Sequence, residues 1–485
     1  MNAPADYGLL ATTRYVPRLR LERSEMFAQH RWMAPGLKGL AKGRRAIAHW
    51  DEDAVTMAVQ ALRSLQHAVP DAGAALTELT LASTSLPFAE RLNAGIVAAA
   101  VGLYEGAALR DLAASPRAAL GELAAALRRP ANSATAVIAA ERRTARPASA
   151  QEMIQGDGAA AVLVGRGAVI AHFVGHSSTH ADLVDHFRES GDAHDHGWEE
   201  RWVRDEGYMK IAVGALQRCL SDAHVSAADI AHFVMAAPLP RVNEAVAKKL
   251  GIAATALVST EHEAVGDLGG AQPLAMLDIA LRAAAPGALI LVAAFGSGCD
   301  ALLLKRTAAP CPGPVPGAGK AETSYLKYLS FTGQINLEWG MRAEMDNKTA
   351  LTAAWRDHAR LARFEGARCS ACGTVQFPRS VVCVNPECRA QATQVALSLA
   401  DAPARVMSHT TDYLAYTPHP PFQFGHVDFE LGARVLMEFA DADAGELAVG
   451  MPLTMVYRIK DFDHQRGFRR YFWKATPLRA TEEND

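Results

Sequence analysis

The stretch Cys369-Ser-Ala-Cys372, followed by Cys383-Val-Asn-Pro-Glu-Cys388, decides the fold of the C-terminal part of the chain. It holds four of the seven cysteines. Two close cysteine pairs joined by a short loop supply the four thiolates of a tetrahedral zinc site. Four thiolates leave no open position for water or substrate, so we expect structural zinc in a zinc ribbon that runs no reaction itself.

A disulfide-stapled module is the alternative interpretation of these cysteines. The opening residues, Met-Asn-Ala-Pro-Ala-Asp-Tyr-Gly, place no basic segment ahead of an apolar one, so we expect no secretory signal. The longest apolar run, Gly287–Phe295, is too short to span a bilayer and predicts a buried strand. We therefore expect a cytoplasmic protein with reduced thiols and no membrane partner.

The composition allows several domains. The chain has 485 residues, of which 50% are hydrophobic, so it can form two or three domains with sizeable cores. Its formal net charge of −3 creates no overall field that would attract nucleic acid or a membrane surface.

Residues 1–306 alternate amphipathic helical patterns with short apolar runs. A helical pattern over 53–65 precedes a strand pattern over 79–83, and the same order recurs at 209–220 and 230–235. This alternation predicts α/β layers around a buried sheet, and the recurrence suggests two similar halves.

The remainder of the chain divides into three predicted parts. A linker and packing segment over 307–350 is rich in proline and glycine and then in aromatic residues. The zinc ribbon follows over 351–396. Residues 397–485 show several short alternating strands between turn residues, a pattern typical of a small β-barrel.

Several stretches of the first 306 residues resemble the thiolase superfamily, specifically hydroxymethylglutaryl-CoA synthase and ketoacyl synthase III. They are Asp51–Val59, Gly156–Gly165, Asp182–Gly191, Val246–Gly251 and Phe295–Gly298. The resemblance implies a five-layered αβαβα fold, usually a homodimer, that binds acyl-CoA and makes or breaks carbon–carbon bonds.

Residues from about 350 onward resemble zinc-ribbon plus OB-fold proteins that accompany such enzymes, on the stretches Arg368–Arg379 and Val449–Tyr457. This resemblance implies an OB-fold barrel that is fused here to the enzyme-like part, which would fix the two at one to one. It also implies a possible thiolase-type partner subunit. An OB barrel can also bind single-stranded nucleic acid. Residues 397–485 carry more acids than bases, and their one basic cluster is Arg466, Arg469 and Arg470, so we predict no nucleic-acid partner.

The superfamily's catalytic residues do not carry over to this chain. Motif by motif, Ser115 stands where the family has its nucleophilic cysteine, and Ala236 stands where it has a histidine. Thr84 takes the place of the synthase glutamate and Asp267 that of an asparagine. The resemblance therefore implies that the usual covalent acyl-enzyme route has been lost.

Ser115 and Asp267 are nevertheless candidate catalytic residues. A serine needs an adjacent base to attack a thioester, and Ser115-Pro116 equally fits a helix N-cap followed by proline at the first helical position. Asp267 is the candidate base, since burial would raise its pKa; a structural carboxylate in a glycine-rich turn is the alternative. Tyr208 is the third candidate, and His262 and Glu263 lie near site-forming segments.

Two functions follow from the resemblance. The first is aldol or retro-aldol chemistry on a CoA thioester without covalent attachment, by an acyl-CoA aldolase or a synthase-like acyltransferase. The second is a non-catalytic scaffold subunit of a thiolase-type complex, and a serine-based Claisen enzyme is a third option. The resemblance implies that the histidine-rich segment over 176–196 is a mobile polar lid above the acyl pocket.

Overall fold

The computed structural model describes residues 7–129, 134–339 and 350–479. Its contacts divide the chain into two compact units. The first comprises residues 1–48, 53–95 and 103–328, and the second comprises 49–52, 96–102 and 329–485. The predicted division into four parts stays a prediction, and residues 340–349 of the predicted linker lie outside the described residues.

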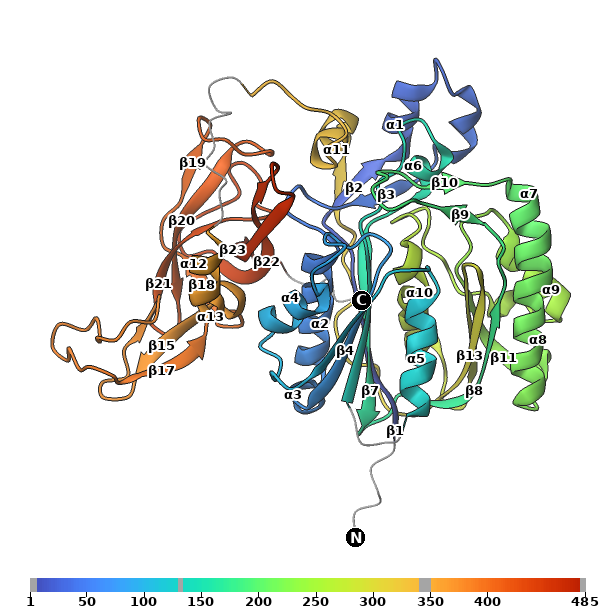
Figure 1. Cartoon of the computed structure of the whole chain (residues 1–485), viewed down its shortest axis with the longest axis horizontal. Helices are drawn as coiled ribbons and strands as arrows, with labels where there is room; N and C mark the ends of the chain where they lie inside the picture. The colour runs from blue at the N-terminus through green and yellow to red at the C-terminus, as the bar shows by residue number, and fades with distance from the viewer. Residues whose placement is uncertain (1–6, 130–133, 340–349, 480–485) are drawn as a thin grey trace, which may run out of the picture. The chain divides into compact units, whose positions relative to one another are not determined.

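A nine-stranded sheet in the order β11-β12-β13-β8-β1-β7-β6-β4-β5 frames the first unit (Figure 1). The strands are β1 (Tyr7–Tyr15), β4 (Leu76–Ala82), β5 (Ala108–Leu112), β6 (Ala134–Glu141), β7 (Gly158–Arg166), β8 (Ala171–His180), β11 (Ile230–Met235), β12 (Leu289–Phe295) and β13 (Gly298–Arg306). Strands β4, β5 and β6 pair in parallel, as do β11 and β12, and the other neighbours are antiparallel. The strand predicted within Gly287–Phe295 is confirmed as the buried strand β12.

Two helices lie between the halves of this sheet (Figure 1). Helix α5 (Ala118–Arg128) contacts β4 and β6 of one half and β8 and β13 of the other. Helix α10 (Gln272–Ala283) likewise contacts β1, β7, β11 and β12. Helix α2 (Ala54–Ala68) packs on β1, β6 and β7, and α8 (Val213–Asp222) packs on β8 and β13. The result is a layered α/β fold, because apolar side chains cover both faces of each half-sheet.

The helix predicted over 209–220 begins earlier, with a π-helical stretch η2 (Val203–Ala212) that continues into α8. The predicted N-cap role of Ser115 is wrong. Helix α5 starts at Ala118 with Arg117 at its N-cap position, so Ser115 lies in the loop before the helix.

The remaining elements of this part of the chain are short. They are β2 (Leu19–Glu22), β3 (Arg44–Ile47), β9 (His186–Phe187), β10 (His196–Gly197), β14 (Lys320–Glu322), α1 (Arg23–His30), α3 (Pro70–Ala74), α4 (Asn93–Ala100), α6 (Ala150–Ile154), α7 (Glu200–Trp202), α9 (Val242–Leu250), α11 (Tyr325–Phe331) and the 3₁₀ turns η1 (Pro35–Leu40), η3 (Ala227–Asp229), η4 (Ala254–Ala256) and η5 (Gly269–Ala271).

The second unit holds two sheets. A three-stranded sheet in the order β16-β15-β17 carries the cysteines, and a six-stranded antiparallel sheet follows it. Their elements are α12 (Leu351–Arg356), α13 (His358–Arg363), β15 (Glu365–Cys369), β16 (Val375–Gln376), β17 (Gln394–Ser398), β18 (Ala404–Val406), β19 (Thr410–Asp412), β20 (Phe422–Phe429), β21 (Arg434–Glu438), β22 (Pro452–Asp463) and β23 (Phe468–Pro477). Closure of the larger sheet into an OB barrel stays a prediction.

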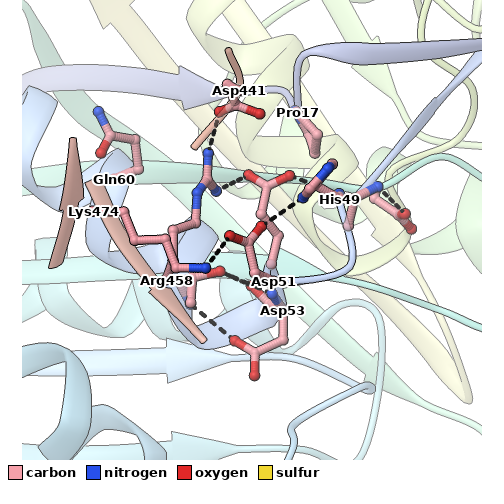
Figure 2. A network of polar contacts seen from close by, with 12 residues as sticks. Pro17, His49, Asp51, Asp53, Gln60, Asp441, Arg458 and Lys474 are labelled. Atoms are coloured by element: carbon pink, nitrogen blue, oxygen red, sulfur yellow. Dashed lines mark hydrogen bonds and ion pairs between the residues drawn. The ribbon is translucent and has the colours of Figure 1, made fainter. Parts of the chain in front are cut away.

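Residues 49–52 take part in a buried polar network of the second unit (Figure 2). The Lys474 ammonium on β23 lies 2.8 Å from a carboxylate oxygen of Asp51 and 3.1 Å from one of Glu438. Arg458 on β22 pairs with Glu52 and, at 2.6 Å, with Asp441. Each buried cation therefore has two acidic partners, which compensates the cost of removing its charge from water.

Candidate functional site

The first unit contains a cavity of about 260 Å³ whose lining combines apolar and ionisable side chains. Its polar and ionisable lining residues are Arg143, Gln151, Gln155, Asp185, His186, Asp195, Glu200, Tyr208 and Asp267. Pro116, Ile154, Trp198, Leu239 and Phe295 are among its apolar ones. Among the described lining residues there is no cysteine. A pocket that combines apolar walls with a few convergent polar groups is typical of a small-molecule site.

Asp267 lies at this cavity in an ion pair with Arg143. The Nη2 atom of Arg143 donates to the Asp267 carbonyl oxygen at 2.6 Å and to its carboxylate Oδ2 at 3.0 Å. Burial opposes ionisation of Asp267, but Arg143, His262 and the Gly269 N–H outweigh it and hold the pKa of Asp267 below its ordinary value. The expectation of a raised pKa for Asp267 is therefore wrong, because it considered burial and left out the cation.

Tyr208 reaches the cavity from the π-helical stretch η2. Its side chain is buried, and its ring packs on Phe295 with centroids 4.7 Å apart. Burial, followed by the charges of Asp185 and Asp267, raises the pKa of Tyr208 well above its ordinary value. The phenol therefore stays protonated, so it can donate a hydrogen bond but cannot act as a base. Long π-helical stretches are rare and frequently mark functional sites.

His186 and Asp185 form a hydrogen-bonded pair at the same cavity. The Nδ1 atom of His186 lies 2.8 Å from Oδ2 of Asp185. This hydrogen bond raises the pKa of His186; burial opposes the rise, and the charges of Asp185 and Asp195 add to it. The sequence analysis missed His186 as a site residue, because the Asp185-His186 dipeptide sits among four other histidines with irregular spacing.

Ser115 does not line this cavity. Its hydroxyl donates to the Gly296 carbonyl oxygen at 3.0 Å, and it borders a second cavity of about 420 Å³ together with His176 and Asp300. Its neighbour Pro116 does line the first cavity, as does Ala236. The structure thus brings Asp267 and Tyr208 to one cavity and leaves the Ser115 hydroxyl outside it.

The other residues that the sequence singled out occupy different surroundings. His262 approaches Asp267, with Nε2 3.9 Å from Oδ1, while Glu263 pairs with Lys42 at the surface. Thr84 donates from its N–H and its hydroxyl to Glu141, a buried carboxylate whose pKa is raised by burial. Sequence reasoning missed Glu141, which is the last residue of the apolar strand β6 and carries no motif of its own.

The four cysteines of the ribbon come together in space. Their sulfur atoms all lie within 4.8 Å of one another, with Cys372 and Cys383 3.6 Å apart and Cys369 and Cys388 3.9 Å apart. Thiolates bound at the usual zinc–sulfur length in a tetrahedron are about 3.8 Å apart, so this donor set fits zinc. No other such cluster of histidine, cysteine or acidic residues occurs in the part of the chain that the structure describes.

In the predicted basic cluster, two of the three arginines pair with neighbouring acids and the third lies over an aromatic ring. Arg466 pairs with Asp463 at 2.7 Å, Arg470 pairs with Asp461, and Arg469 stacks on Phe462. Within the described ranges, none of the helices has the length and apolarity needed to cross a membrane.

Comparisons with known proteins match the N-terminal part to condensing enzymes. Residues 220–305 match the family described as 3-oxoacyl-[acyl-carrier-protein] synthase III C terminal. The chain is 28% identical over 295 residues to hydroxymethylglutaryl-CoA synthase of Aeropyrum pernix, covering 60% of this chain and 82% of that protein. The first unit is thiolase-like. Both this sequence match and the layered α/β fold described above support that description.

Solved structures share the fold of the thiolase-like domain. 3-Oxoacyl-(acyl carrier protein) synthase III, FabH, of Pseudomonas aeruginosa superposes with a TM-score of 0.55 at 20% identity, covering 64% of this chain and 99% of that one. MvaS in complex with 3-hydroxy-3-methylglutaryl coenzyme A gives 0.53 at 19% identity, with coverages of 63% and 84%. At these identities the likeness establishes the fold alone.

The C-terminal part resembles a different group of proteins. Residues 356–394 match the family described as ChsH2, rubredoxin-like zinc ribbon domain. A DUF35 domain-containing scaffold protein of Methanothermobacter thermautotrophicus is 27% identical over 132 residues, covering 27% of this chain and 97% of that protein. The chain thus joins a thiolase-like domain to a ChsH2-type zinc ribbon in a DUF35-like region.

Proposed function

We propose that the thiolase-like domain binds a CoA thioester and makes or breaks a carbon–carbon bond by aldol or retro-aldol chemistry, without a covalent acyl-enzyme. The observation that carries this proposal is the cavity of a condensing-enzyme fold lined by acid–base side chains but by no described cysteine. The named similarity to hydroxymethylglutaryl-CoA synthase supports a CoA ester as the ligand.

In the cleavage direction, a base takes the proton of the β-hydroxyl group of a 3-hydroxyacyl-CoA. The bond between Cα and Cβ breaks, a carbonyl forms at Cβ, and its electrons move onto the thioester as an enolate. The same proton, returned to Cα, gives a shorter CoA ester and an aldehyde or ketone. Donors directed at the enolate oxygen lower the barrier most.

Arg143 and Tyr208 are the two donors that we assign to the enolate oxygen. The Tyr208 phenol stays protonated, and the Arg143 guanidinium is held at the cavity by Asp267. Asp267 itself, predicted as the base, is a weak one, because its pKa lies below the ordinary value. In this proposal it orients Arg143.

The proposal further includes a bound zinc ion and a homodimer. It also includes an OB barrel that holds a partner. Zinc bound by Cys369, Cys372, Cys383 and Cys388 would have a structural role, because four thiolates leave no position for substrate.

The test follows a panel of 3-hydroxyacyl-CoA esters of increasing chain length by liquid chromatography and mass spectrometry. We expect a shortened CoA ester plus an aldehyde or ketone in equal amounts from wild type. Ser115→Ala is the matched control and should keep full turnover. An acyl adduct on Ser115, or no cleavage of any ester, would contradict the proposal.

A scaffold subunit is the second candidate function, favoured by the likeness to the named scaffold protein over 97% of its length. It predicts no turnover by the isolated chain and a stimulated rate when an active thiolase-type enzyme is added. Titration of such an enzyme with the chain, read out as its rate, separates the two functions.

A further inference from the structure

We infer that His186 is the catalytic base of this reaction and that Asp185 is its positioning residue. The inference rests on the proposed function. Neither residue occupies a position to which the superfamily resemblance assigns a catalytic role.

The geometry fixes which nitrogen of His186 can act. Its Nδ1 lies 2.8 Å from the Asp185 carboxylate, which can only accept, so Nδ1 carries the hydrogen. In the neutral ring the lone pair is then on Nε2. His186 lines the cavity beside Tyr208 and Arg143, so a β-hydroxyl group held there has a base and two donors around it.

A small hairpin holds His186 in place. His186 on β9 pairs with Gly197 on β10, and the next residues, Phe187 and His196, stack with ring centroids 5.1 Å apart. A Cβ atom on Gly197 would lie 2.5 Å from Nε2 of Gln151, so the hairpin backbone lies directly against this side chain of α6. The base is therefore presented on a supported element.

The surrounding charges suit a base that works near neutral pH. The acids that face His186 are Asp185 beside it and Asp195 before β10, and Glu200 of α7 lines the same cavity. The opposing cation is Arg143, from the segment after β6, while Arg188 lies 3.4 Å from Asp195. A base is most effective when its pKa lies near the working pH, which a histidine meets and the ion-paired Asp267 does not.

The protons balance over one cleavage. Nε2 takes the hydroxyl proton and the ring becomes an imidazolium, whose charge Asp185 stabilises. The departing enolate carries the matching negative charge beside Tyr208 and Arg143. Transfer of that proton from the ring to Cα restores both the neutral base and a neutral product.

The test measures kcat and KM over pH for His186→Gln and Asp185→Asn on an ester that wild type cleaves. We expect His186→Gln to lower kcat by at least about 100-fold with little change in KM, since general bases contribute about 10²–10⁴. In Asp185→Asn the acidic limb of kcat/KM should move to lower pH, because the carboxylate that raises the pKa of His186 is gone. His180→Gln, an exposed histidine on β8, is the control and should match wild type.

Full turnover by His186→Gln, with an unchanged pH profile, overturns this inference and leaves the proposed function standing. Failure of wild type on every ester overturns both. If His186→Gln does not fold, Asp185→Asn decides alone, and an acidic limb that stays at the wild-type position contradicts the role of His186.

Discussion

The carboxylate of Asp267 is subject to two opposing influences. Burial favours its neutral form, while the guanidinium of Arg143 at 3.0 Å favours its ionised form, and the second prevails. The two residues are 124 positions apart in the chain. Burial of Asp267 could be predicted from its glycine-rich surroundings, but the direction of its pKa shift depends on a contact that no local pattern contains.

Removal of either partner of this pair should destabilise the thiolase-like domain strongly. We expect Asp267→Asn and Arg143→Met each to lower the free energy of unfolding by about 3–5 kcal/mol, because each leaves a buried group without its partner. The double variant should lose less than the sum of the two. Urea unfolding of the three variants measures this coupling, and strictly additive losses would show that the pair is not coupled.

Helices and strands with a clear pattern of apolar residues could be predicted from the sequence. Elements whose position depends on distant contacts could not. The apolar run that ends at Phe295 and the pattern over 230–235 are confirmed as β12 and β11. The two-residue strands β9 and β10, which hold His186, are too short to carry a period. The loop at Ser115 has the sequence of a helix start, yet α5 begins only at Ala118.

Strands β21, β22 and β23 carry ionic side chains into the interior of the second unit. Among them, Lys474 holds a buried positive charge. Burial opposes its charge, but Asp51 and Glu438 outweigh burial and raise the pKa of Lys474. Burial likewise opposes ionisation of the two acids, yet Lys474 holds the pKa of each below its ordinary value. These depressed pKa values stabilise the fold above about pH 4, and that stability is lost as the pH falls through the folded pKa values.

Lys474→Met should weaken this pH dependence. Removal of the cation should raise the pKa of Asp51 and Glu438. His49 still lowers the pKa of Asp51 and Lys460 still lowers that of Glu438, so the variant should lose less stability than wild type as the pH falls below about 4. At pH 7 we expect a loss of about 3–5 kcal/mol. Lys460→Met is the matched control, because Lys460 also pairs with Glu438 but is 37% exposed, and it should cost no more than about 1 kcal/mol. Thermal unfolding above and below about pH 4 measures the difference, and an equal decline in wild type and Lys474→Met would count against the network.

At the scale of the whole molecule, the thiolase-like domain and the zinc ribbon differ in what stabilises them. The thiolase-like domain has extensive apolar clusters among its sheet and helices. The ribbon has only three short strands and the cysteine cluster. A module this small has little apolar core and relies on a metal or a cross-link for stability. The cysteine spacing was sufficient to predict this module, because its ligands are close in sequence.

Metal removal should therefore affect the zinc ribbon and the thiolase-like domain unequally. We expect close to one zinc per chain by elemental analysis of wild type, and less in Cys369→Ser. Cys311→Ser, which alters a half-buried cysteine outside the cluster, should retain the full amount. A strong chelator should increase hydrogen exchange over 365–398 before it does so over β12, since metal binding supplies much of the folding free energy of such modules. Unchanged exchange in both regions after metal loss would show that the ribbon does not need the ion.

Synthesis on the ribosome sets the order in which the second unit can close. Asp51 is made 423 residues before Lys474, its buried counter-charge. At about 5–20 residues per second, its carboxylate waits about 20–85 s for that partner and must stay in water meanwhile. Segment 49–52 can therefore reach its final packing only when β23 has left the exit tunnel. The packing of residues 49–52 is thus completed by a strand that is made long after them.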